Sequence, residues 1–269
     1  HAMEIVAGAR MRRTERRALD ARPYAARLSE LIGVLLGDVH ARREHSLLTG
    51  RDSPAILVIH MTTDKGLCGA LNTRLNQSLG MYALEHSEPL KVATVGRKGR
   101  DFALRSGLDL LAEFSDLGDA PGMAGLMPLC HLAIHSFMSE AVGLVYLSYP
   151  RFAGTFVQTP VLEQLLPVDT TRTQAYSNVE FVVDSDSELL LESLLVRHVE
   201  AEVYRAYLEL VACEYSARMI AMRNATESAR DLSEELTLEL NKVRQAAVTG
   251  EISDVSAGVE ALSAGGLHG

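Results

Sequence analysis

The sequence predicts an α/β protein with long helices: an antiparallel coiled coil of the N- and C-terminal helices plus a Rossmann-like domain with a mostly parallel sheet. Three observations predict this class. Small and apolar residues repeat in heptads at the start of the chain, apolar strand-like runs alternate with helical segments in the middle, and no glycine or proline occurs from Asp186 to Thr249.

These patterns divide the 269 residues into four segments. We expect an N-terminal coiled-coil helix over 1–50, a nucleotide-free α/β domain over 54–170, a long C-terminal coiled-coil helix and its end over 186–262, and a flexible tail over 263–269. Glycine, serine and proline between the first two segments indicate a turn.

The first segment is predicted as one helix. Its seam follows alternating steps of three and four through Ala7, Met11, Thr14, Ala18, Ala21, Ala25, Leu28, Ile32, Leu35 and Val39. Pro23 could kink this helix, because proline removes a backbone donor and crowds the preceding turn. Gly8 is expected to destabilise it by about 1 kcal/mol relative to alanine.

The middle segment is predicted to alternate strands and helices. Strands are expected at "AILVIHMT", "LKVATV" and "VGLVYLSYP", with "TFVQTPVLEQLLPV" continuing through a hairpin. Helices are expected at "GALNTRLNQSLGMYALEH", "GRDFALRSG" and "LMPLCHLAIHSFMSEA", and a loop at "SDLGDAPGMAG". Such alternation is typical of a parallel sheet covered on both faces.

The last helix would be about 95 Å long at about 1.5 Å per residue. Its seam can be drawn through Leu208, Val211, Tyr215, Arg218, Met222, Ala225, Ala229, Leu232, Leu236, Glu239, Val243 and Ala246. Heptad helices at opposite ends of the chain predict the antiparallel coil, with the α/β domain attached to one side.

The stretch "TDKGLCGALN" has the strand–turn–helix layout of a phosphate-binding loop. Gly66 and Gly69 are three residues apart, however, and neither GxxxxGK[ST] nor GxGxxG is present. We therefore expect the two glycines to form a structural turn and no cofactor to bind. "VGRKGRD" is likewise better explained as a plain turn between a strand and a helix.

Composition excludes several other classes. The net charge of −9 and the absence of tryptophan do not favour nucleic-acid binding, and no apolar stretch is long enough for a transmembrane span. Cys68, Cys130 and Cys213 lie far apart and predict no zinc site. His131 and His135 share a helical face without an apparent third ligand, and His60 is expected in the core or at a strand edge, so neither a metal site nor a catalytic group is predicted.

Four ordered segments resemble the gamma subunit of F-type ATP synthases. They are "AMEIVAGARMRR" with "ARPYA", "TDKGLCGALN", "VQTPVLEQLLP", and "EYSARMIAMRNATESARDL" followed by "LELNKVRQAAVTGEISDVSAGVEAL". The resemblance implies a non-catalytic central-stalk rotor that couples ion-driven rotation of the membrane c-ring to conformational change in the catalytic beta subunits. It implies as partners the alpha and beta subunits, the epsilon subunit and the c-ring.

The resemblance also implies site residues. Met3, Arg244, Gln245 and Thr249 would contact the stator, and the basic stretch "ARMRRTERR" would face acidic loops of the beta subunits, unless it is only a solvated face. Arg218 and Met222 would support coupling, although packing in the seam explains Met3 and Met222 as well.

The chain departs from the family in two ways. The family is expected to have further residues before "AMEIV", and the cysteine-bearing insertion of chloroplast gamma subunits is not found in this sequence. We therefore expect a peripheral membrane protein on the cytoplasmic face of a bacterial plasma membrane or, alternatively, on the matrix side of the mitochondrial inner membrane. Two other functions stay open: a soluble nucleotide- or metabolite-binding α/β protein with helical dimerisation arms, and a coiled-coil adaptor without a motor role.

Overall fold

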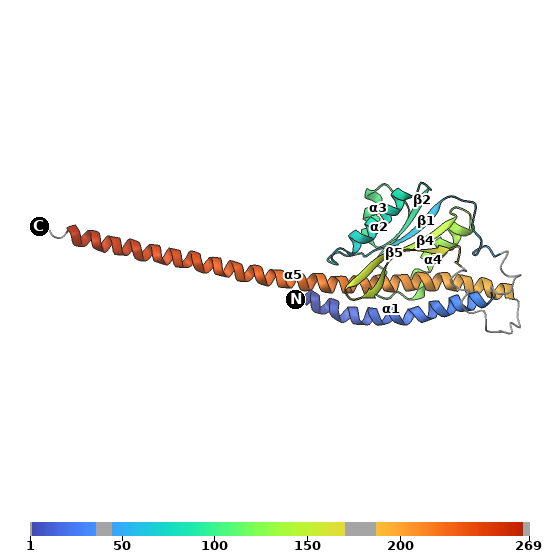
Figure 1. The fold of residues 1–269 in the computed structure, drawn as a ribbon, viewed down its shortest axis with the longest axis horizontal. Coiled ribbons are helices and arrows are strands. Elements are labelled where there is room, and N and C mark those ends of the chain that lie inside the picture. The colour runs from blue at the N-terminus through green and yellow to red at the C-terminus, as the bar shows by residue number, and fades with distance from the viewer. Residues whose placement is uncertain (1, 36–44, 170–186, 266–269) are drawn as a thin grey trace. The chain divides into compact units, whose positions relative to one another are not determined.

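The computed structural model describes residues 2–35, 45–169 and 187–265. They form five helices and five strands (Figure 1). In chain order these are α1 (Ala2–Leu35), β1 (Ile56–Met61), α2 (Leu71–Glu85), β2 (Leu90–Val95), α3 (Arg97–Arg105), β3 (Asp109–Phe114), α4 (Met123–Met138), β4 (Leu144–Gly154), β5 (Val157–Leu166) and α5 (Ser187–Gly265). The chain divides into two compact units, 1–222 and 223–269.

The sheet has the strand order β3-β2-β1-β4-β5. The first four strands run parallel, with Ile56 opposite Leu90 on one side and Leu144 on the other, and β5 is antiparallel to β4. The predicted mostly parallel sheet and the predicted hairpin are therefore confirmed. This order brings the carboxyl ends of β1, β2 and β3 together at one edge.

Both faces of the sheet are covered by helices. Along β1, Leu57 and Ile59 belong to a core shared with α4 and α5, whereas Ile56 and Val58 belong to a second core with α2 and α3. Apart from the buried His60, β1 is apolar throughout, because a strand buried on both faces has no solvent-exposed side.

Strand β3 was not predicted from the sequence. It lies at the edge of the sheet beside β2 and alternates exposed and half-buried positions along Asp109–Phe114. The alternation is blurred in the sequence, because the apolar Leu111 occupies an exposed position, and the strand lacks the long apolar run of a central strand.

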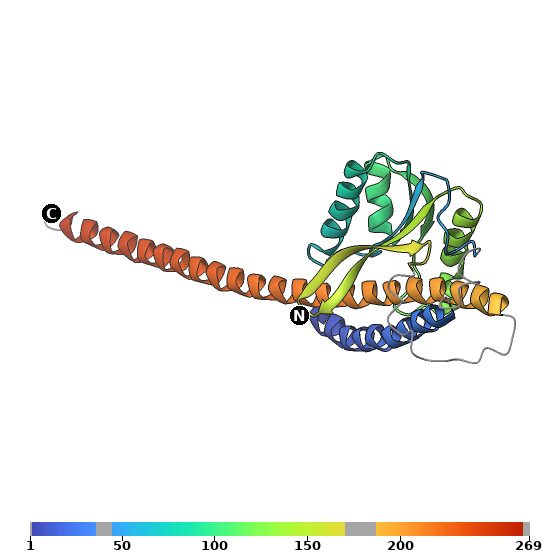
Figure 2. The same ribbon diagram turned by 45° about the vertical axis from the view of Figure 1, so that its right-hand side comes forward.

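Helix α1 packs antiparallel against α5, and Figure 2 shows the two helices side by side. Gly8 near the start of α1 faces Met219, whereas Ala25 and Leu28 share a cluster with Ala201. The predicted seam is buried at Ala7, Thr14, Ala18, Ala25, Leu28 and Ile32. Pro23 lies inside α1, which remains one helix, and the predicted seam position Val39 lies outside the described residues.

The second unit consists, in its described part, of the remainder of α5. Its side chains are almost all exposed over 223–260, including the predicted seam residues Leu232, Leu236 and Val243. The helix extends to Gly265 and so includes the first three residues of the segment predicted as a tail, whereas 266–269 lie outside the described residues.

Candidate functional site

The loop between β1 and α2 is braced by hydrogen bonds between Thr63 and Asn72, the second residue of α2. Asn72 donates to the hydroxyl of Thr63 over 2.8 Å, and the Asn72 carbonyl oxygen accepts the Thr63 N–H at 3.1 Å. Left-handed backbone occurs at Leu67 (φ 62°) and Gly69 (φ 57°), but not at Gly66. Gly69 therefore occupies a position that favours glycine, and Gly66 does not.

Asp64 occupies the place where an anion would bind at the start of α3. Its two carboxylate oxygens accept the backbone N–H groups of Arg97 at 3.2 Å and Asp116 at 3.0 Å. The N–H of Gly99 donates to the Thr62 hydroxyl at 2.7 Å. Phosphate binding at a helix N-terminus uses such free N–H groups, and here the protein's own oxygens bond them.

The glycines of "VGRKGRD" allow this close approach. Gly96 has φ of 88°, and a Cβ there would lie 2.2 Å from the Thr62 carbonyl oxygen. A Cβ on Gly99 would lie 2.9 Å from the Thr62 hydroxyl. The interpretation of this stretch as a turn between a strand and a helix is confirmed, because β2 ends at Val95 and α3 begins at Arg97.

Helix α5 fills the carboxyl edge of the parallel strands. Tyr207, Leu210, Val211 and Glu214 lie against the ends of β1, β2 and β3, where a cavity of only about 20 Å³ remains. The Tyr207 hydroxyl donates to the carbonyl oxygen of Gly118 over 2.6 Å. Nucleotides in doubly wound folds bind at this edge, so α5 takes the space that such a ligand would need.

Beside this edge lies a groove of about 570 Å³. Its walls come from α1, the loops after β1 and β3, and α5. Three residues singled out in the sequence, Met3, Gly66 and Arg218, all line it. Arg218 donates to the Gly66 carbonyl oxygen at 3.2 Å and pairs with Glu214 at 2.6 Å. The side chain of Arg218 thus joins α5 to the glycine turn after β1, two segments that are far apart in sequence.

Tyr215 links α1 to the loop after β3 at the same groove. Its hydroxyl donates to Asp119 over 2.5 Å and accepts from Arg10 over 2.8 Å. The guanidinium groups of Arg10 and Arg218 lie 5.7 and 5.5 Å from the ring centroid of Tyr215. Arg10 is therefore held by Tyr215 and Asp119 although its side chain is 55 % exposed. Arg12, Arg13 and Arg16 of the same basic stretch are exposed as well.

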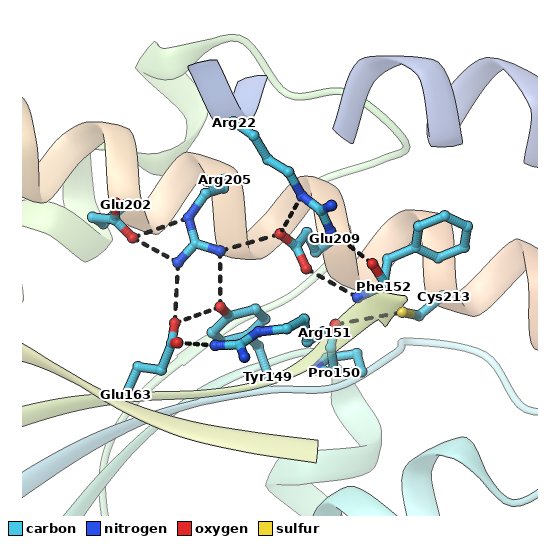
Figure 3. A network of polar contacts seen from close by, with 10 residues as sticks. All are labelled: Arg22, Tyr149, Pro150, Arg151, Phe152, Glu163, Glu202, Arg205, Glu209 and Cys213. Atoms are coloured by element: carbon cyan, nitrogen blue, oxygen red, sulfur yellow. Dashed lines mark hydrogen bonds and ion pairs between the residues drawn. The ribbon is translucent and has the colours of Figure 1, made fainter. Parts of the chain in front are cut away.

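A second polar cluster joins both long helices to the hairpin of β4 and β5 (Figure 3). We call it the polar clamp and define it as Arg22 of α1, Tyr149 and Phe152 of β4, Glu163 of β5, and Glu202, Arg205 and Glu209 of α5. Arg205 bonds to Tyr149 at 2.8 Å and to Glu163 at 3.1 Å. Burial alone lowers the pKa of Arg205, but Glu202 and Tyr149 outweigh it and raise that pKa above its usual value.

Sequence reasoning missed the polar clamp. The one signal was the spacing of Glu202, Arg205 and Glu209, which places three charges on one helical face at steps of three and four. Charges at such steps are usually solvated, whereas here the side chain of Glu209 is only 1 % exposed.

Neither a metal site nor a membrane span emerges from the described parts of the chain. Over 2–35, 45–169 and 187–265 no three ligating side chains gather, and His131 and His135 are both exposed. No helix within these ranges is long and apolar enough to cross a bilayer.

Comparison with known proteins decides the family. A family profile described as ATP synthase matches residues 1–262. The ATP synthase gamma chain of Dehalococcoides mccartyi is 41 % identical over 97 % of this chain and 92 % of its own length, and that of Chloroflexus aurantiacus is 42 % identical with the same coverage. The chain belongs to the ATP synthase gamma chain family.

Solved structures with the same fold come from mitochondrial ATP synthases. A chain of the Tetrahymena thermophila mitochondrial ATP synthase, from a structure of its central stalk and c-ring, aligns with a TM-score of 0.67 at 24 % identity, covering 84 % of this chain and 98 % of that one. A chain of the Euglena gracilis enzyme aligns with a TM-score of 0.62 at 19 % identity, covering 97 % of each chain. The predicted family and fold are confirmed, and the alternatives of a ligand-binding α/β protein and a coiled-coil adaptor give way to a non-catalytic subunit of ATP synthase.

The residues singled out by resemblance to gamma subunits fall in two places. Met3, Arg218 and Met222 lie in the first unit, where Met3 is 61 % exposed and Met222 half-buried. Arg244, Gln245 and Thr249 lie on α5 in the second unit and are exposed. The structure brings Met3 and Arg218 to one groove.

Proposed function

We propose that this chain is the central-stalk rotor subunit of an F-type ATP synthase. Rotation of the membrane c-ring, driven by ion flow, turns the chain, and the turning chain drives sequential conformational change in the catalytic beta subunits. The observation that carries this proposal is the match to ATP synthase gamma chains that are 41 % and 42 % identical over 97 % of this chain. The antiparallel pairing of α1 with α5 provides a stiff element suited to transmitting torque.

Asymmetry is the physical basis of the coupling. A single helical shaft contacts three chemically identical beta subunits differently at any moment. A contact shifts a conformational equilibrium only by its difference in free energy between the two states. Rotation therefore passes each beta subunit through a cycle of nucleotide affinities without any catalytic group on the shaft.

The proposed partners divide between the paired helices and the α/β domain. The helix pair would enter the hexamer of alpha and beta subunits, and the α/β domain would contact the epsilon subunit and the c-ring. The Tetrahymena neighbour comes from a structure of a central stalk with a c-ring, which supports this assignment. The net charge of −9 gives no reason to add nucleic acid as a partner.

The site residues are proposed in the roles that the gamma family implies. Arg244, Gln245 and Thr249 would contact the beta subunits during rotation, and their exposure on α5 is consistent with this. Met3 would lie near the contact between rotor and stator. Arg218 would support coupling by holding α5 to the loop at Gly66, and Met222 would act beside it. Gly66 and Gly69 would shape the turn only.

The proposed location is the cytoplasmic face of a bacterial plasma membrane, as a peripheral subunit. The bacterial sources of the relatives that are about 40 % identical support it. The matrix side of the mitochondrial inner membrane is the second candidate, which the mitochondrial neighbours favour at lower identity.

Reconstitution tests the rotor proposal. This chain is mixed with alpha and beta subunits of a bacterial gamma-family relative, and the mass of the complex and its ATPase activity are measured. We expect one copy bound per hexamer and an ATPase that depends on the chain. Truncation before Arg244 should abolish this dependence.

Substitution tests the contact residues. The triple change Arg244→Ala, Gln245→Ala and Thr249→Ala should lower coupled ATPase activity at least severalfold. A matched control, Asn241→Ala with Lys242→Ala, changes exposed polar residues of the same part of α5 and should leave activity near the wild-type level. Equal losses of activity in both variants would rule out the proposed contact set. Failure of the unmodified chain to form a complex with the alpha and beta subunits would rule out the rotor assignment.

A further inference from the structure

Strand β4 extends beyond its partner β1. The ladder between them ends where His60 lies opposite Ser148, whereas β4 continues to Gly154. In this extension the two long helices bond the backbone of Phe152. Its N–H donates to Glu209 over 2.9 Å, and its carbonyl oxygen accepts from Arg22 over 2.6 Å (Figure 3).

Glu209 is the centre of the polar clamp. Besides the Phe152 N–H, its carboxylate accepts from Arg22 at 3.2 Å and from Arg205 at 3.1 Å. Arg205 in turn reaches Tyr149 and Glu163 on the hairpin. One buried carboxylate thus connects α1, α5 and β4 directly, and β5 through Arg205.

Stability alone does not account for such a cluster. Buried ion pairs are often no more favourable than apolar side chains of similar size, because burial removes their hydration. Their hydrogen bonds differ from apolar packing in being directional, since they weaken steeply when donor and acceptor are misaligned. The polar clamp therefore adds a directional resistance to sliding and turning of the hairpin about α5, which the non-directional hydrophobic effect does not itself supply.

We propose that Arg22, Arg205 and Glu209 act as a torsional lock that holds the α/β domain at a fixed angle to the α1–α5 pair while torque passes between them. They are positioning residues and carry no chemistry. The inference rests on the proposed rotor function, because only a rotating shaft loads this junction in torsion. Loss of these contacts should let the α/β domain turn more freely about the α1–α5 pair.

The test measures torsional stiffness in the assembled complex of alpha, beta and this chain. A rotation probe is attached through Ser106→Cys, an exposed position after α3, because all three native cysteines are buried. The angular variance of the probe is recorded with hydrolysis stopped. Arg22→Met, at a side chain that is 39 % exposed, should increase this variance at least twofold. Glu209→Gln should increase it further, and Arg22→Lys should restore part of the stiffness.

The control is Glu30→Gln, which breaks the exposed pair of Arg27 and Glu30 within α1 and should leave the variance unchanged. If the probe on these variants shows the wild-type angular variance, even with a lower melting temperature, the lock is overturned and the rotor function is left standing. If Glu209→Gln does not assemble with the alpha and beta subunits, the angular variance of Arg22→Met alone decides whether the lock exists. A wild-type chain that does not rotate in the hexamer overturns the rotor function and this inference together.

Discussion

Asp64 bonds backbone N–H groups from two connections of the sheet, those after β2 and after β3. Its replacement leaves two donors without their partners at the carboxyl edge. We expect Asp64→Ala to lower the free energy of unfolding by about 1–3 kcal/mol, since hydrogen bonds to charged groups fall in this range. The free energy of unfolding of Asp64→Asn should lie between those of the wild type and Asp64→Ala, because the amide keeps one accepting oxygen. Urea unfolding measures both.

The exposed Asp52 provides the matched control for this prediction. Asp52→Ala removes the same carboxylate from a surface position and should change the free energy of unfolding by no more than about 0.5 kcal/mol. If the two alanine variants unfold at the same urea concentration, Asp64 does not hold the edge together.

His60 makes the stability of the chain dependent on pH. Its ring nitrogens lie 2.9 Å from the Ser148 hydroxyl and 3.0 Å from the Asn76 amide oxygen, and the side chain is fully buried. Burial lowers the pKa of His60 from 6.5 to about 4. Folding therefore favours the neutral ring, whose contribution is complete above pH 6.5 and is lost as the pH falls towards 4, by about 1.4 kcal/mol for each pH unit.

The measurement is the free energy of unfolding in urea between pH 7 and pH 5. His60→Gln keeps a polar side chain and removes this titration, so the loss of stability on acidification should be smaller in the variant by about 2 kcal/mol at pH 5. Parallel pH curves for the wild type and the variant would show that His60 is not the group responsible.

At the scale of elements, we expect alanine at two helical glycines to change the free energy of unfolding in opposite directions. A Cβ on Gly8 of α1 would lie 3.4 Å from the sulfur of Met219, an ordinary contact with a flexible side chain. Alanine favours a helix over glycine by about 1 kcal/mol. We therefore expect Gly8→Ala to raise the free energy of unfolding by about 0.5–1 kcal/mol, as measured by urea unfolding.

Gly99 of α3 is the contrasting case. A Cβ there would lie 2.9 Å from the Thr62 hydroxyl and 3.0 Å from the His60 ring, both buried. Overpacking of this kind destabilises by about 1–3 kcal/mol, which outweighs the gain in helix propensity. Gly99→Ala should therefore lower the free energy of unfolding. A stabilising effect at this position would mean that the junction of β1 and α3 adapts more easily than its geometry indicates.

The expected elements agree with the observed ones where periodicity is strong. The seam of α1 and the central strands were predicted because a buried face leaves a regular apolar pattern. Strand β3 was missed because an edge strand with an exposed face leaves little pattern. The seam drawn through α5 changes in character along the helix: Leu208, Val211 and Tyr215 are buried, whereas Leu232 and Leu236 are exposed.

At the scale of the whole molecule, we expect the two units to have separable roles. The first unit contains the described cores, and side chains of the second unit are mostly exposed. A chain ending at Met222 should unfold thermally within a few degrees of the full chain, because removing exposed residues changes stability little. The same truncation should abolish the ATPase that depends on the chain in the reconstituted complex.

Circular dichroism and the reconstitution assay measure the two properties separately. Truncation before Arg244 is the intermediate control, since it keeps part of the second unit and the whole of the first. A large loss of melting temperature in the chain ending at Met222 would contradict the independence of the first unit.

The sequence by itself determined the order of helix, α/β domain and helix, the parallel sheet and the gamma family, because periodicity and ordered motifs are local properties of the chain. Only the tertiary structure decided which polar groups meet. Arg218 reaches Gly66, Asp64 caps α3, α5 fills the carboxyl edge, and Glu209 holds Phe152. These contacts join residues far apart in sequence, and the geometry of packing selects them from many charges with the same local pattern.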